Sequence, residues 1–348
     1  MNNSSGILIF VLKNGEGELR SGWRILIYLL LFMIFVFMLA ALVAALGGVV
    51  TGGRGMRIDL LQEPPTKQPI TDKGLLVVFL NRSVNLVAAL AASAVCARFL
   101  ERRSFASVGY KLHAGWLKDF SLGNLLGALS LALAVAISYM AGATSFAPRD
   151  ATPQSILINA VILFVIFLIA AAFEEVVFRG FMFQALLHNF RVMLGERGAV
   201  ATVAITSLAF GVMHAFNPSA TFFSVANTML AGVWLGAAYL KTRSLWLATA
   251  LHVAWNYVMV FAFGLPVSGI TMFNEMALVE GRSGPPVWLS GGDYGPEGGA
   301  AATLALILSL ALIIKWRALR ASEDMLIATR HGSTERRVDA PPAESSEA

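Results

Sequence analysis

Long apolar runs, each close to the length that a helix needs to cross a bilayer, recur along the whole chain. A membrane-spanning helix requires about 20 predominantly apolar residues. Eight such runs are predicted, at 23–46, 74–100, 120–143, 156–178, 199–216, 218–240, 245–265 and 300–314. Because 57% of the residues are hydrophobic and only 14% are charged, the composition excludes an ordinary soluble domain. The expected fold is an all-α polytopic membrane protein, a bundle of about eight transmembrane helices.

The first run, 23–46, follows basic residues, as the apolar core of a signal peptide does. Such a core spans only about 7–15 residues, whereas this run is long enough to cross the hydrocarbon layer. We therefore interpret it as an uncleaved first helix.

Basic residues between the runs predict the orientation, since cytoplasmic loops carry the excess of Lys and Arg. With the N-terminus inside, the inner segments hold Arg102, Arg103, Lys111, Lys118, Arg191, Arg197, Lys241, Arg243, Lys315, Arg317 and Arg320. Both termini are therefore expected in the cytoplasm. The net charge of +5 belongs to this pattern, so we exclude nucleic acid as a partner.

Three ionisable residues, Glu174, Glu175 and Arg179, lie within the otherwise almost uncharged run from 156 to 183. Charges at membrane depth are costly and mark functional sites by default. Glu175 and Arg179 are four residues apart, so they face each other on a helix and predict a salt bridge. Glu174 points about 100° away around the helix, which leaves it free for chemistry.

Two histidines, His214 and His252, also lie at membrane depth. Each belongs to a pair with a spacing of four, Phe210 with His214 and His252 with Asn256, so the members of a pair share one helix face. Other polar residues of the runs are better explained by helix packing or snorkelling, although Asn227 could line a cavity. These residues are Asn81, Arg82, Asn85, Asn227 and Thr228.

A carboxylate, two imidazoles and a carboxamide that converge in a cavity suit the addition of water to a carbonyl group. Glu174 would take the proton from water, assisted by His214. His252 and Asn256 would donate hydrogen bonds to the oxyanion. Glu174, His214 and His252 could instead hold a divalent metal such as zinc, because one carboxylate and two imidazoles form a catalytic zinc set. We favour the mechanism without a cofactor.

Three motifs in successive apolar runs, Glu174-Glu175-x-x-x-Arg179, Phe210-x-x-x-His214 and His252-x-x-x-Asn256, resemble the signature of the CAAX prenyl protease and bacteriocin-processing (CPBP) family. The resemblance implies an intramembrane endopeptidase with a cavity in which Glu174 and His214 activate water. His252 and Asn256 would form the oxyanion hole, with Glu175, Arg179 and Phe210 in support. The family has been described both as a glutamate protease and as a metalloprotease.

The resemblance and the composition together divide the chain into six segments. These are a cytoplasmic N-terminal segment at 1–22, N-terminal transmembrane helices at 23–150, a CPBP-like catalytic membrane core at 151–265, a Gly/Pro-rich extramembrane loop at 266–299, a last transmembrane helix at 300–320 and a disordered polar tail at 321–348. The expected partners are the lipid bilayer and a membrane-associated peptide or protein substrate. Two other functions keep the same fold, namely a proton- or cation-coupled transporter and a non-catalytic membrane scaffold or immunity-type protein.

Overall fold

The computed structural model describes residues 12–13, 17, 19–50 and 64–329. The helices and strands in this part of the chain are α2 (Ser21–Val50), α3 (Asp72–Phe99), α4 (Trp116–Met140), β1 (Thr144–Pro148), α5 (Pro153–Glu175), α6 (Phe183–Leu194), α7 (Arg197–His214), α8 (Phe222–Thr242), α9 (Leu245–Tyr257), β2 (Val279–Ser283), α10 (Val287–Ser290), α11 (Ala300–Lys315) and α12 (Glu323–Ala328). Seven helices among the described residues are long and apolar enough to cross a membrane, and α11 is a shorter apolar helix. The protein is an integral membrane protein with a mainly helical fold, as the sequence predicts.

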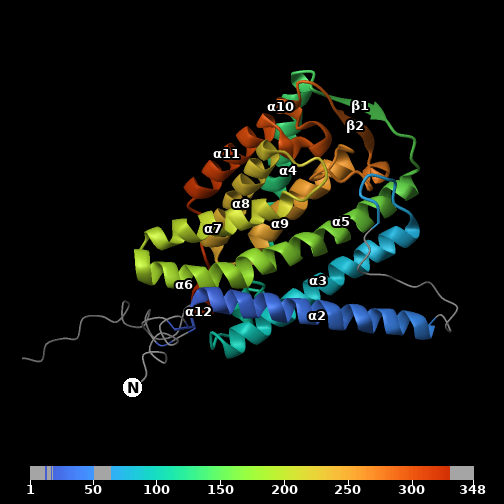
Figure 1. The fold of residues 1–348 in the computed structure, drawn as a ribbon. Helices are drawn as coiled ribbons and strands as arrows, with labels where there is room; N and C mark the ends of the chain where they lie inside the picture. The colour runs from blue at the N-terminus through green and yellow to red at the C-terminus, as the bar shows by residue number, and fades with distance from the viewer. Residues whose placement is uncertain (1–11, 14–16, 18, 51–63, 330–348) are drawn as a thin grey trace, which may run out of the picture.

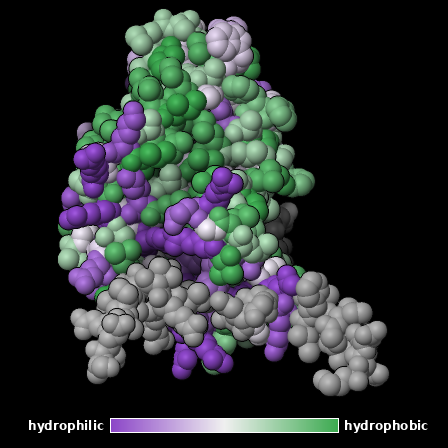
Figure 2. Space-filling view, turned by 90° about the vertical axis from the view of Figure 1, so that its left-hand side faces the viewer, coloured by the Kyte–Doolittle hydropathy of each residue, from purple (hydrophilic) through white to green (hydrophobic). Residues whose placement is uncertain are grey.

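The helical bundle has two distinct ends (Figure 1). The sheet and α10 lie at one end, whereas α12 and the connection from α6 to α7 lie at the other. Large apolar side chains point outward from the long helices, including Leu30 and Phe37 on α2 and Leu157 on α5. Figure 2 views the side where α6 and α7 meet, and there a hydrophobic upper part is separated from hydrophilic residues that gather across the middle and lower part. This division suits a protein surrounded by lipid.

The helix that carries the two glutamates is longer than predicted, because it continues through Phe178 as one element from Pro153 to Leu194. Thr152 caps its start by accepting a hydrogen bond from the backbone of Ser155. It ends where Gly195 takes a positive φ of 57°. The helix predicted at 156–178 ends too early. Polar residues appear in α6, so the apolar pattern stops there, but the helix itself continues to the end of the bundle.

Helix α9 is the most deeply buried of the long helices. It packs so closely on α4 that a Cβ at Gly127 would lie 2.5 Å from the carbonyl oxygen of Leu251. Gly123 and Gly127, four residues apart, form a small-residue face against which α9 rests. This close approach holds His252, the next residue of α9, at a defined depth in the bundle.

Two features of the described chain differ from expectation. The loop at 266–299 is not a featureless connection, because it contains β2, α10 and several 3-10 turns, and β2 pairs antiparallel with β1 to form a two-stranded sheet. The predicted disordered tail begins with α12, whose Met325 is fully buried, while the rest of the tail, from 330, lies outside the described residues. The short elements of the loop and α12 have no long periodic pattern, so the sequence does not predict them.

Candidate active site

Glu174 and Glu175 end α5, and the chain then continues through a π-helical segment, Val176–Met182. Such wide turns are rare and frequently occur at functional sites. The two carboxylates face different surroundings, since the Glu175 side chain is fully buried and the Glu174 side chain is 28% exposed. The structure therefore separates them as their spacing around the helix predicts.

Glu175 is the centre of a buried ionic network. Its Oε1 accepts a hydrogen bond from Arg179 Nη1 at 3.0 Å and lies 3.0 Å from His252 Nδ1. Because this oxygen is already paired with a guanidinium, the carboxylate is the acceptor and His252 Nδ1 donates. Arg179 Nη2 also donates to the carbonyl oxygen of Gly232 at 3.1 Å, so the network joins α5, the π-helical segment, α8 and α9.

Phe210 supports the same groups through its ring. The guanidinium carbon of Arg179 lies 4.7 Å from the ring centroid, a cation–π contact. The ring centroid of Phe210 is 4.6 Å from that of His214 and 6.1 Å from that of His252. Phe210 therefore sits between the buried ionic network and both imidazoles.

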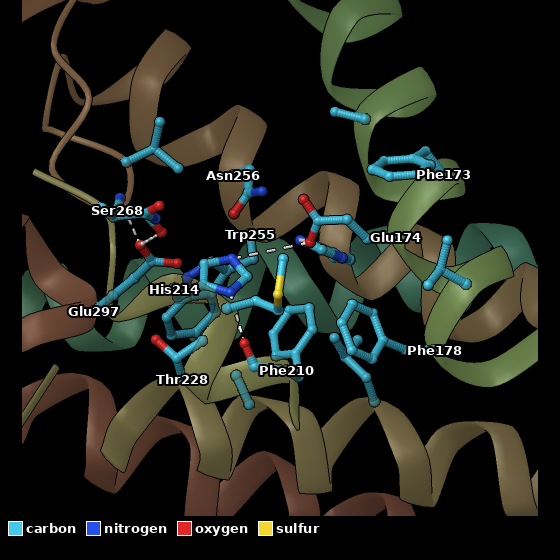
Figure 3. Close-up of a pocket in the computed structure, with 18 of the residues that line it drawn as sticks. Phe173, Glu174, Phe178, Phe210, His214, Thr228, Trp255, Asn256, Ser268 and Glu297 are labelled. Atoms are coloured by element: carbon cyan, nitrogen blue, oxygen red, sulfur yellow. Dashed lines mark hydrogen bonds and ion pairs between the residues drawn. The ribbon is translucent and has the colours of Figure 1, made fainter. Parts of the chain in front are cut away.

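Glu174 faces His214 in Figure 3 and also lies close to His252. Its Oε2 lies 4.0 Å from His214 Nε2 and 3.8 Å from His252 Nε2. His214 Nδ1 donates to the carbonyl oxygen of Phe210 at 2.8 Å, which leaves the lone pair of a neutral His214 on Nε2. Glu174 Oε2 is buried and has no hydrogen-bond partner among the described residues.

Asn256 follows His252 by one turn on α9 and lines the same cavity. Figure 3 shows its carboxamide and the Glu174 carboxylate pointing into the same space. All seven residues that the three motifs contain are thus brought together, although they come from three separate helical regions.

The cavity around them has a volume of about 640 Å³ and is walled mainly by apolar side chains. Its polar wall residues are Arg82, Glu174, His214, Asn217, Asn227, Thr228, His252, Asn256, Ser268 and Glu297. Arg82 and Thr228, which were expected only to snorkel or to pack helices, thus line the cavity, as does Asn227. Asn81 and Asn85 hydrogen-bond to each other at 2.9 Å and do not line it.

Asn217, Ser268 and Glu297 were not among the predicted site residues. Ser268 and Glu297 belong to the segment at 266–299, which the sequence predicts only as an extramembrane loop. No periodicity or motif signals that this loop folds back over the cavity. Only its tertiary contacts place these residues on the cavity wall.

The residues around Glu174 do not meet the distances of a metal site. No group of three His, Cys, Asp or Glu side chains among the described residues is arranged to hold a metal ion. Two ligand atoms on a tetrahedral zinc with bonds of about 2.0 Å lie about 3.3 Å apart. The separations of 4.0 and 3.8 Å from Glu174 Oε2 to the two imidazoles are wider.

The helical bundle therefore surrounds an internal cavity that is lined by these charged and imidazole groups. Residues 156–258 match the family described as "Type II CAAX prenyl endopeptidase Rce1-like". The chain therefore carries an Rce1-like domain, which confirms the resemblance to the CPBP family. The match contains all seven motif residues, while α2, α3, α4, the 266–299 loop and α11 lie outside it. A search of curated proteins found no match to the chain.

Proposed function

We propose that this protein is an intramembrane endopeptidase in which Glu174 activates the attacking water. The observation that carries the proposal is the gap between Glu174 Oε2 and His214 Nε2, which are 4.0 Å apart. Both atoms are acceptors, so one water at about 2.8 Å from each could donate a hydrogen to both of them. The lone pairs of this water are then free to attack a carbonyl carbon.

In the first step the water oxygen forms a bond to the carbonyl carbon of the scissile peptide while Glu174 accepts the released proton. The electron pair of the carbonyl double bond moves to its oxygen and forms an oxyanion. When the tetrahedral intermediate collapses, the C–N bond breaks and Glu174 returns the proton to the leaving amine. His214 keeps the water aligned through its Nε2.

His252 and Asn256 stabilise the oxyanion in this proposal. His252 Nδ1–H is engaged by Glu175, so an Nε2–H donor requires the imidazolium form. Glu174 Oε2 and Glu175 Oε1 lie 3.8 and 3.0 Å from the two ring nitrogens. Asn256 supplies the second donor through its carboxamide nitrogen.

The substrate that fits this cavity is a membrane-associated peptide or protein. The wall includes Leu29 and Phe32 of α2 and Phe173 of α5, so apolar side chains surround the polar centre. We further propose that the end of the bundle bearing α12 and the α6–α7 connection faces the cytoplasm, since Arg191 and Arg197 flank that connection and Lys111 pairs with Asp324 of α12. Both termini are then cytoplasmic.

The decisive experiment compares wild type with Glu174→Gln on a mixture of synthetic amphipathic peptides in detergent, with products identified by mass spectrometry. The carboxamide cannot accept the proton, so cleavage should fall by roughly 10²- to 10⁴-fold while the thermal unfolding midpoint stays unchanged. Glu280→Gln, an exposed residue of β2 that does not line the cavity, is the matched control and should cleave normally.

The peptide assay and a cellular assay together test the alternative functions. A transporter shows no cleavage with either protein. A scaffold keeps its cellular function in a Glu174→Ala, His252→Ala double variant, and that result would overturn the proposal.

A further inference from the structure

The loop at 266–299 contributes a second carboxylate to the cavity. Glu297 and Ser268 both line it, and Figure 3 shows them on the side of His214 that faces away from Glu174. Glu297 Oε2 accepts hydrogen bonds from Ser268 at 2.7 Å from the backbone nitrogen and 2.6 Å from the hydroxyl. The carboxylate is therefore fixed relative to the catalytic groups.

The backbone around Glu297 is held in place from several sides. Asn227 Nδ2 donates to the carbonyl oxygens of Glu297 and Gly299 at 2.9 and 3.0 Å, and its Oδ1 accepts from Thr303 at 2.7 Å. Gly295 approaches so closely that a Cβ there would lie 1.9 Å from the carbonyl oxygen of Pro266. These contacts make Glu297 a preorganised group rather than the end of a mobile loop.

Glu297 lacks a cationic partner within the described part of the chain. No Lys, Arg or His side chain forms a salt bridge with it there, although Arg82 and His214 line the same cavity, and Ser268 supplies the hydrogen bonds to its Oε2. Nearby Tyr294 stays neutral, because burial, followed by the Glu297 charge, raises the pKa of its phenol to about 12. A fixed carboxylate on the wall of a mainly apolar cavity favours a ligand that brings a positive charge into contact with it.

A purely structural role of Glu297 would not require a charged side chain. Ser268 has a positive φ of 48°, and the two bonds to Glu297 Oε2 stabilise that turn. A glutamine in place of Glu297 could accept the same two bonds through its carbonyl oxygen. A substitution by glutamine keeps both acceptor contacts and removes the negative charge, so it separates the two roles.

We propose that Glu297 forms a cation-binding subsite of the cavity that takes the ammonium or guanidinium group of a Lys or Arg side chain of the substrate. This inference rests on the proposed endopeptidase function and adds a substrate class to it. A sphere of 640 Å³ is ~11 Å across, and an extended peptide rises about 3.3 Å per residue. The basic residue should accordingly lie within about four residues of the scissile bond.

The test measures binding separately from cleavage, using the Glu174→Gln protein in detergent. The probes are fluorescent apolar peptides of Leu and Ala in which one position at a time carries Lys, uncharged norleucine or Glu. At one position or two neighbouring ones, the Lys peptide should bind about tenfold tighter than the norleucine peptide, as expected for one charge-assisted contact. The Glu174→Gln, Glu297→Gln double variant should lose this preference.

The matched control is Glu174→Gln combined with Glu275→Gln, which removes an exposed carboxylate of the same loop away from the cavity. This variant should keep the preference for Lys. Equal binding of Lys and norleucine peptides at every position overturns the subsite even if no Glu297 variant folds. A preference for Lys that survives Glu297→Gln also overturns the subsite.

Cleavage by the wild-type protein is scored on the same peptides. A preference for Lys in binding without any cleavage would reject the endopeptidase and keep the subsite, whereas cleavage without the preference would reject the subsite alone.

Discussion

His252 Nδ1 lies 3.0 Å from Glu175 Oε1, the same oxygen that accepts a hydrogen bond from Arg179. The sequence predicts the Glu175–Arg179 pair but gives no sign that His252 joins it. Through this contact Glu175 orients the imidazole and sets which nitrogen carries a proton. Glu175 therefore acts as a positioning residue for His252 as well as the partner of a buried arginine.

Arg179→Ala should destabilise the fold by about 3–5 kcal/mol, because it leaves the buried Glu175 carboxylate without its guanidinium. It also removes the bond to Gly232 and the contact with Phe210. Thermal unfolding in detergent measures the effect. Arg282→Ala, which removes an exposed arginine paired with Glu280, is the control and should leave the midpoint unchanged. If Glu174→Gln destabilises as much as Arg179→Ala, the roles of the two glutamates have been assigned wrongly.

Asn256→Ala should lower kcat by about 10²- to 10³-fold, since one oxyanion donor is lost. Its unfolding midpoint should not change, because the half-buried carboxamide supports no other described residue. Asn274→Ala gives the opposite pattern, as Asn274 donates to the carbonyl oxygen of Gly264 at 3.0 Å and does not line the cavity. A normal kcat in Asn256→Ala would remove this residue from the oxyanion hole.

Chelation should leave the activity unchanged if Glu174 works without a metal. Incubation with EDTA or phenanthroline, followed by the peptide assay and metal analysis of the purified protein, measures this. Loss of activity that zinc restores would establish the metalloprotease alternative, with Glu174, His214 and His252 as the ligands.

His113 should make the fold less stable as the pH drops below 6.5. This residue lies in the connection before α4, with its Nε2 3.3 Å from Ser244 Oγ and 3.6 Å from Asp119 Oδ2. Burial, ahead of the nearby charges, lowers the pKa of His113 below 6.5. Between that lowered pKa and 6.5 the unfolded chain binds more protons than the folded one, so acid favours unfolding.

The pH effect is measured as the unfolding midpoint between pH 7.5 and 5.5 in wild type and His113→Gln. The variant should show a shallower decline. An equal decline in both proteins would assign the acid sensitivity to other groups.

The Glu174–Arg179 motif illustrates how much local sequence can predict. A spacing of four on a helix brings Glu175 to Arg179, and a spacing of one turns Glu174 away, so both directions follow from helical geometry alone. The π-helical segment that begins at Val176 does not follow from it. A wide turn depends on the tertiary contacts around it, and no residue preference announces it.

The sequence by itself determined that this chain is a helical membrane protein with an Rce1-like polar centre. The long apolar runs with few charges predict the helices, and the spacing inside each motif predicts the polar centre. Only the tertiary structure decided that His252 shares an oxygen of Glu175 and that Glu297 returns from a Gly/Pro-rich loop to the cavity wall. The physical reason is the distance along the sequence between the residues that must meet. Hydrophobicity and helical periodicity are patterns over a few neighbouring residues. His252 and Glu175, in contrast, are 77 residues apart, and Ser268 and Glu297 are 29 apart. Whether such distant residues meet depends on the packing of the whole bundle.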